Sequence, residues 1–96
     1  MSEDAAEELY LILATAAAGP TTRYASGERR RVLLFVRAGS HDAALAGATA
    51  GLAEQGWGEP AFQKAGIIEL GPHLTADDRA PAEHALEHGF AMRVYS

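Results

Sequence analysis

The chain has 96 residues, of which 48% are hydrophobic and 22% charged, with a formal net charge of −5 and no cysteine. This length allows one domain, residues 1–96, and excludes a cleft between two domains. The lack of cysteine excludes disulfides, thiolate nucleophiles and cysteine-based metal sites. Alanine is abundant and Lys64 is the only lysine, a bias typical of GC-rich bacterial genomes.

The negative charge is concentrated at the start of the chain, and the remainder is nearly neutral. We therefore expect residues 1–7 to form an acidic, flexible tail. A nearly neutral body argues against nucleic acid or an anionic membrane as partner. The apolar run of residues 9–18 is too short to span a bilayer, and it follows acidic residues rather than the basic region of a signal peptide. We expect a cytoplasmic protein. The early acidic residues are Glu3, Asp4, Glu7 and Glu8.

Residues 8–16 fit either a strand or a helix. Ala5, Leu9, Ile12, Leu13 and Ala16 recur at helical spacing, whereas the run 9–13 is apolar on both faces, as in a buried strand. The strand gives the sheet a fourth member, so we predict it. A helix, giving the order α-β-α-β-α-β, remains the alternative.

The clearest element is a strand over residues 31–37, which is apolar on both faces and therefore belongs in the middle of a sheet. Ser40 is placed to cap a following helix that ends before Gly56. The residues of this helix expected to face the sheet are Leu45, Ala48, Thr49 and Leu52.

The second half of the chain predicts a strand, a helix and a final strand. The first strand covers residues 61–70, and the last covers residues 90–95. Proline is tolerated only in the first turn of a helix, so Pro81 predicts that the helix begins with Asp78 as N-cap. Its expected buried side chains are Ala82, Ala85 and Leu86.

These elements predict an α/β fold with the order β-β-α-β-α-β, in which about four strands form one mixed sheet and two helices cover one face. The arrangement loosely resembles ferredoxin-like α/β sandwiches. The strand order differs from theirs, and no motif of any family can be matched.

One candidate site is the start of the helix after Ser40. Free backbone N–H groups at a helix N-terminus attract anions, and Arg37 and His41 would add positive charge beside Gly39 and Ser40. Ser, His and Asp are adjacent here, but consecutive helical residues point about 100° apart, so they cannot align as a catalytic triad. A capped helix start without further function explains the same residues.

A second candidate is the pair His84 and His88, four residues apart on one side of a helix. This spacing suits two ligands of zinc or nickel, but a tetrahedral site needs three or four ligands. A solvated helix face explains the same pair.

A third set of candidates concerns contacts between proteins. Arg29, Arg30 and Arg31 form the only basic run, which would bind an acidic partner such as the N-terminus of a neighbouring subunit, or would only prevent aggregation of strand edges. Tyr24 is an aromatic contact candidate in a loop. Gly47 and Gly51 form a small ridge suited to close contact between helices of a dimer or to packing on the sheet.

The function expected first is a non-enzymatic protein-interaction or regulatory module that acts as a homodimer and needs no cofactor. Its basis is the central strand, which is apolar on both faces while the predicted helices cover only one. The alternatives are a sensor of small ligands or anions at Ser40 and a metal-binding protein built on His84 and His88.

Overall fold

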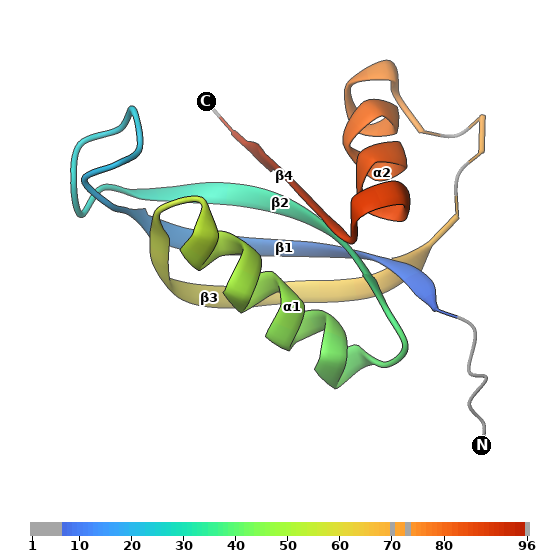
Figure 1. The fold of residues 1–96 in the computed structure, drawn as a ribbon. Helices are drawn as coiled ribbons and strands as arrows, with labels where there is room; N and C mark the ends of the chain where they lie inside the picture. Colours follow the sequence, from blue (N-terminus) through green and yellow to red (C-terminus); the bar gives the residue numbers. More distant parts are fainter. Residues whose placement is uncertain (1–6, 70, 73, 96) are drawn as a thin grey trace.

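The structure is a computed structural model that describes residues 7–69, 71–72 and 74–95. Its elements follow the predicted order β-β-α-β-α-β, and the N-terminal segment is a strand (Figure 1). The expected acidic tail, residues 1–7, lies outside the described residues except for Glu7. The elements are β1 (Glu8–Ala18), β2 (Arg29–Ala38), α1 (His41–Glu54), β3 (Trp57–Ile68), α2 (Ala76–His88) and β4 (Phe90–Val94).

The four strands form one sheet in the order β3-β1-β2-β4. The hairpin of β1 and β2 is at the centre, which agrees with a central strand that is apolar on both faces. We expected a mixed sheet. Every pair of neighbouring strands is instead antiparallel. The last two strands of the chain are added at opposite edges of this hairpin.

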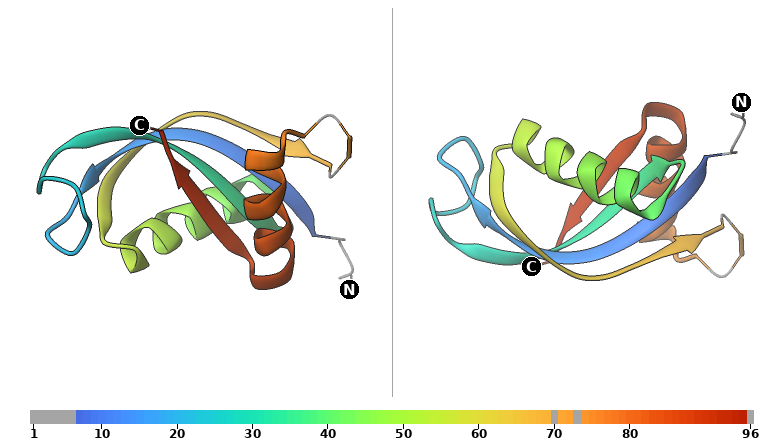
Figure 2. Two further views of the ribbon diagram at one scale, coloured as in Figure 1. Left: turned by 90° about the horizontal axis from the view of Figure 1, so that it is seen from above. Right: turned by 90° about the horizontal axis from the view of Figure 1, so that it is seen from below.

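The two helices cover opposite faces of the sheet. Val32, Leu34 and Val36 of β2 share a core with α1, while Leu33 and Phe35 share a second core with α2. Figure 2 shows α1 inside the concave side of the curved sheet and α2 at the start of β4. The expectation of two helices on one face, as in a ferredoxin-like sandwich, is therefore corrected.

The strand directions explain this correction. The strands β2 and β3 run in the same direction with β1 between them, so the handedness rule for parallel crossovers applies to α1. The strands β3 and β4 run in opposite directions, and the rule does not apply to the connection that contains α2. The chain is thus free to place α2 on the other face.

Helix α1 begins as predicted, with the Ser40 side chain accepting a hydrogen bond from the Ala43 N–H at 3.1 Å. Gly56 follows the helix in a left-handed conformation, with φ of 89°. Thr49 is exposed and donates its hydroxyl to the Leu45 carbonyl, so it does not face the sheet as expected. The buried positions are Ala44, Ala48, Gly51 and Leu52.

Helix α2 begins one turn earlier than predicted. Its N-cap is Thr75, whose side chain accepts from the Asp78 N–H at 3.2 Å, and Pro81 therefore lies inside the helix. Ala82 and Ala85 are buried as predicted, whereas Leu86 is exposed. Neither of the two helices in the described part of the chain is long and apolar enough to cross a membrane.

Candidate functional site: the open face of the sheet

The face of the sheet that carries α2 is only partly covered. This helix packs mainly on β4 and β2 and reaches only the start of β1, where Leu9 is buried. Over the rest of β1 and over β3, neither of the helices formed by the described residues lies on the convex side of the sheet in either view of Figure 2. We call this uncovered area the open face.

An apolar groove of about 320 Å³ lies on the open face. Leu11 and Leu13 of β1 point to it because they alternate with Ile12, which is fully buried under α1. Both leucines remain half-buried, since α2 does not extend over them. The groove, named here the open-face groove, is lined by Leu11, Leu13, Leu33, Lys64, Ala65, Gly66, Ile67, Ile68 and Tyr95.

Basic side chains border the groove at the end near the β1–β2 turn. Arg29 and Arg31 share the face of Leu33, because alternate residues of a strand point to the same side. Arg29 donates to the Thr15 hydroxyl at 3.0 Å and pairs with Glu59 at 3.8 Å. The guanidinium of Arg31 is exposed and has no hydrogen bond or ion pair with the described residues.

The arginines and Tyr95 also line a shallow hollow of about 380 Å³ next to the groove. Apolar surface and unpaired positive charge therefore lie side by side on the open face. This combination suits contact with a partner surface that is apolar at its centre and acidic at its edge.

An ion pair lies at the opposite end of β1. Glu7 lies before the strand on the side of the open face, and its carboxylate accepts from Arg37 Nε at 3.1 Å. Glu8 follows it and is exposed, but it belongs to the α1 face, because it alternates in the strand with Leu9 and pairs with Ala38. The open face thus carries Arg29 and Arg31 at one end and the ion pair of Glu7 and Arg37 at the other.

Of the residues proposed for an anion site, Gly39, Ser40 and His41 adjoin at the start of α1, whereas Arg37 is engaged elsewhere. Arg37 points to the C-terminal end of α2, where its guanidinium donates to the Leu86 carbonyl, and to Glu7. The His41 ring lies edge-on to Tyr10, with 6.4 Å between ring centres. Gly39 is exposed, and the Ser40 hydroxyl is occupied as a helix cap. Arg37 is engaged elsewhere, so the positive charge expected at this helix start is not provided by that residue.

His84 and His88 do lie together, as their spacing predicts. Their ring centres are 4.4 Å apart, and His88 Nε2 lies 3.3 Å from a Glu87 carboxylate oxygen. Among the described residues no group of three or more histidine, aspartate, glutamate or cysteine side chains is arranged to hold a metal ion.

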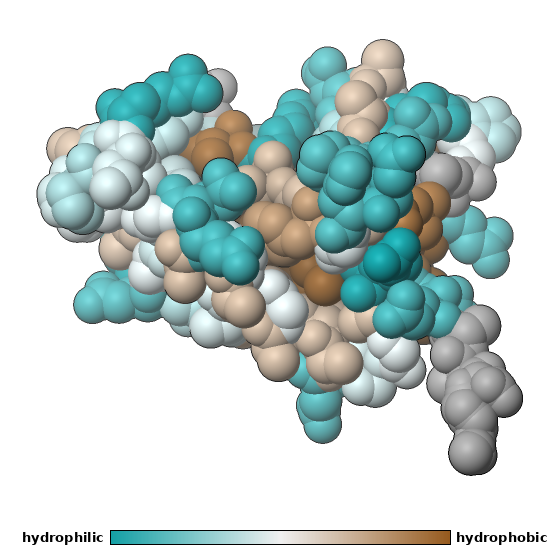
Figure 3. All heavy atoms as spheres, in the orientation of Figure 1, coloured by the Kyte–Doolittle hydropathy of each residue, from teal (hydrophilic) through white to brown (hydrophobic). Residues whose placement is uncertain are grey.

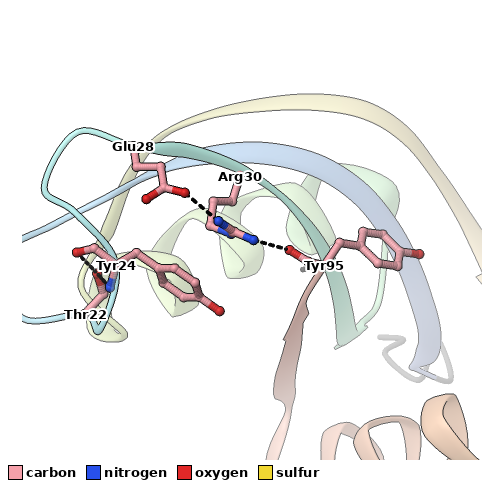
Figure 4. Close-up of polar contacts among 5 residues, drawn as sticks. All are labelled: Thr22, Tyr24, Glu28, Arg30 and Tyr95. Carbon is pink, nitrogen blue, oxygen red and sulfur yellow. Dashed lines mark hydrogen bonds and ion pairs between the residues drawn. The ribbon is translucent and has the colours of Figure 1, made fainter.

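Tyr24 is not a free contact residue. Its ring centre is 5.5 Å from that of Trp57, and the Arg30 guanidinium lies 4.5 Å above the ring. Figure 4 shows Arg30 between Glu28 and the main-chain carbonyl of Tyr95, both of which accept from it. These contacts fix the β1–β2 loop to the body of the protein, so Tyr24 and Arg30 have a structural role that the sequence did not indicate.

Gly47 and Gly51 face the sheet rather than a second subunit. A Cβ atom at Gly47 would lie 3.1 Å from Val36, and one at Gly51 would lie 2.5 Å from the Phe90 ring. These contacts favour the alternative interpretation, in which the two glycines allow close packing of α1 on the sheet. In Figure 3 the outer surface of α1 is pale, since small residues such as Ala46 and Ala50 cover it.

Sequence reasoning missed the open-face groove, although a signal was present. The alternation of Leu9, Leu11 and Leu13 with Tyr10 and Ile12 implies two apolar faces of β1. Which of these leucines a helix would cover depends on the position of α2, which periodicity does not specify. Comparisons of this chain with protein-family models, curated proteins and solved structures find no match.

Proposed function

We propose that this protein is a non-enzymatic protein-interaction module that acts as a homodimer, with the two subunits in contact through the open-face groove. The observation that supports the proposal is that Leu11, Leu13 and Ile68 remain partly exposed around one continuous apolar groove. A contiguous apolar patch on a sheet face marks a site of association.

Burial of apolar surface favours association through the open-face groove. Burying apolar surface contributes about 25 cal/mol per Å², so closing the groove against a second apolar face stabilises a complex substantially. Standard interfaces bury about 800 Å² on each partner. The protein measures 43 × 31 × 22 Å, so an interface of this size would occupy most of one broad face.

A second copy of the chain is the simplest occupant. An isologous contact uses the same patch on both subunits, and an apolar centre is complementary to itself. A regulatory role would follow if formation of the dimer controlled access to the groove by another protein.

The oligomeric state tests the proposal directly. Light scattering coupled to size-exclusion chromatography at micromolar concentration should give the mass of a dimer. Leu13→Lys would place a charge in the centre of the groove and should yield a monomer. Ala50→Lys, on the outer surface of α1, is the matched control and should leave the dimer intact.

Circular dichroism separates loss of the dimer from loss of the fold. Leu13 is only half-buried, so the Leu13→Lys variant should keep the spectrum of the parent protein. A folded parent protein that is monomeric at 100 µM would contradict the proposal. A Leu13→Lys variant that remains dimeric would show that the subunits meet elsewhere.

A further inference from the structure

Two cations without a partner among the described residues border the open-face groove. Lys64 of β3 lines the groove itself, and Arg31 of β2 lines the basic hollow next to it. Both residues are exposed, and neither has a hydrogen bond or ion pair with the described part of the chain. Arg93, by contrast, is held by the Asp78 carboxylate at 2.6 Å. The charges of Lys64 and Arg31 are therefore accessible to a ligand on the open face.

A β-bulge in β3 directs Lys64 to the open face. Lys64 pairs with Leu13, whereas Ala14 pairs with Phe62, so Gln63 is an extra residue at this point. Phe62 packs against the core under α1, and in a regular strand Lys64, two residues later, would lie on that same face. The bulge thus places a charged side chain in the wall of a groove whose other described lining residues are uncharged.

The two cations flank Thr15 of β1. Arg31 pairs directly with Thr15, and Lys64 pairs with Leu13, which precedes Thr15 by two residues on the same face of the strand. The Thr15 hydroxyl accepts a hydrogen bond from Arg29 at 3.0 Å, and its own proton has no acceptor among the described residues. An anionic group above Thr15 would therefore meet positive charge from two strands and a hydroxyl donor from a third.

The groove has the size and lining of a site for a small molecule. Its volume of about 320 Å³ is within the range of about 300–1,000 Å³ found for such sites, which are mostly apolar with a few polar groups. The stretch of β3 along it, from Lys64 to Ile68, extends about 13 Å. Tyr95 lines both the groove and the basic hollow, and Figure 4 shows its ring pointing away from Arg30. The apolar and basic parts are therefore contiguous.

We infer that the open-face groove binds a free aliphatic carboxylate of medium chain length, with its chain on Leu11, Leu13 and Ile68 and its carboxylate between Lys64 and Arg31. A carboxylate accepts charge-assisted hydrogen bonds from both cations, and the planar guanidinium matches it in shape. The ligand is a dissolved molecule rather than a lipid within a bilayer, because the nearly neutral body of the chain does not favour an anionic membrane.

The ligand and a second subunit would use the same surface. A molecule that binds only the free subunit shifts the association equilibrium towards the monomer by mass action. An aliphatic carboxylate would therefore regulate the dimer by competing for the groove. This competition rests on the proposed homodimer, whereas the ligand site rests only on the groove and its two cations.

Titration with carboxylates of increasing length tests the site, using decanoate below its micelle-forming concentration as the main probe. Changes in NMR amide chemical shifts should be centred on Leu11, Leu13 and Lys64. The affinity should rise about threefold for each methylene from hexanoate to decanoate, because each CH₂ group is buried in the groove. Acetate should cause no change, and decyltrimethylammonium should bind about 10-fold more weakly than decanoate, because its cationic head is repelled.

Neutral variants of the two cations test the position of the carboxylate. Arg31→Gln and Lys64→Gln should each weaken decanoate binding about 10-fold, because each removes a charge-assisted hydrogen bond. Both residues are exposed, so the variants should keep the circular dichroism spectrum of the parent protein. Arg23→Gln is the matched control: this exposed arginine lies against Tyr24 in the β1–β2 loop, and its loss should leave decanoate binding unchanged.

Sedimentation equilibrium with and without decanoate separates this inference from the proposed function. Saturating decanoate should convert the dimer to a folded monomer. A dimer that persists in decanoate would overturn the inference and leave the homodimer standing. A parent protein that is monomeric yet binds decanoate through Arg31 and Lys64 would overturn the homodimer and leave the ligand site standing. Decanoate binding that neither glutamine variant weakens would overturn the ligand site in either case.

Discussion

Gly51 of α1 lies directly against the aromatic ring of Phe90 in β4, where a Cβ atom would come within 2.5 Å of the ring. This contact brings the helix close to the last strand of the chain, at the far edge of the sheet from β3. It also explains why a glycine is present in the interior of a helix, where glycine costs about 1 kcal/mol relative to alanine.

Gly51→Ala should lower the free energy of unfolding, by up to about 2 kcal/mol. Overpacking a close contact costs about 1–3 kcal/mol, which exceeds the gain of about 1 kcal/mol in helix propensity. Urea denaturation followed by circular dichroism measures the change. Ala50→Gly, at the exposed neighbouring position, should cost about 1 kcal/mol through propensity alone. If Gly51→Ala stabilised the protein, the close packing of α1 on Phe90 would be contradicted.

Tyr24→Ala should shift the fluorescence emission of Trp57 to longer wavelength. Trp57 is the only tryptophan in the chain and is 6% exposed, partly because Tyr24 packs against it. Removing the tyrosine ring admits water to the indole. Tyr95→Ala is the control, because that side chain belongs to the core on the other face and its loss should leave the emission unchanged.

Ser40→Ala should destabilise the protein by about 1 kcal/mol, whereas Ser40→Gly should cost only a few tenths. The alanine variant loses the hydrogen bond to the Ala43 N–H, and glycine leaves that donor accessible to water. Thermal unfolding of the two variants measures the difference. Equal losses in both variants would mean that the side-chain cap does not stabilise α1.

Pro81→Ala should raise the free energy of unfolding by about 1–3 kcal/mol. Pro81 is inside α2, where it removes the hydrogen bond that a residue at this position would donate to the Asp77 carbonyl. Pro72→Ala, in the preceding loop, should instead lower the free energy of unfolding by about 0.4–1 kcal/mol, because it increases the conformational entropy of the unfolded chain. Chemical denaturation of both variants tests the contrast, and a destabilised Pro81→Ala variant would show that the proline fits its site without loss.

Strong local patterns were sufficient to predict much of the fold. The run of apolar residues 32–36 placed β2 at the centre of the sheet, and Ser40 and Gly56 marked the ends of α1. The errors within the helices arose because the residues there differ little in hydrophobicity. In the alanine-rich α1, Thr49 and Gly51 have similar hydrophobicity, so periodicity could not show which of them faces the sheet.

Long-range placement could not be predicted from the sequence. Both Thr75 and Asp78 are good N-caps, and the earlier one is used because Pro81 is tolerated inside α2. The side of the sheet on which α2 lies depends on where β4 pairs, and that pairing is decided by contacts with β2. The open-face groove is a consequence of this placement. The sequence therefore indicates its apolar residues but not that they are exposed.

The strand order implies a sequence of events during folding. The two inner strands are consecutive in the chain and are joined by the loop of residues 19–28, so they can pair before β3 and β4 have been synthesised. Each outer strand then pairs with one free edge of this hairpin: β3 follows α1 and pairs with β1, and β4 follows α2 and pairs with β2. We expect the slowest folding step to be either the pairing of β1 with β2 or the docking of β3 after its crossover. When the native state opens locally, β4 should detach first, because it pairs through only five residues at one edge of the sheet.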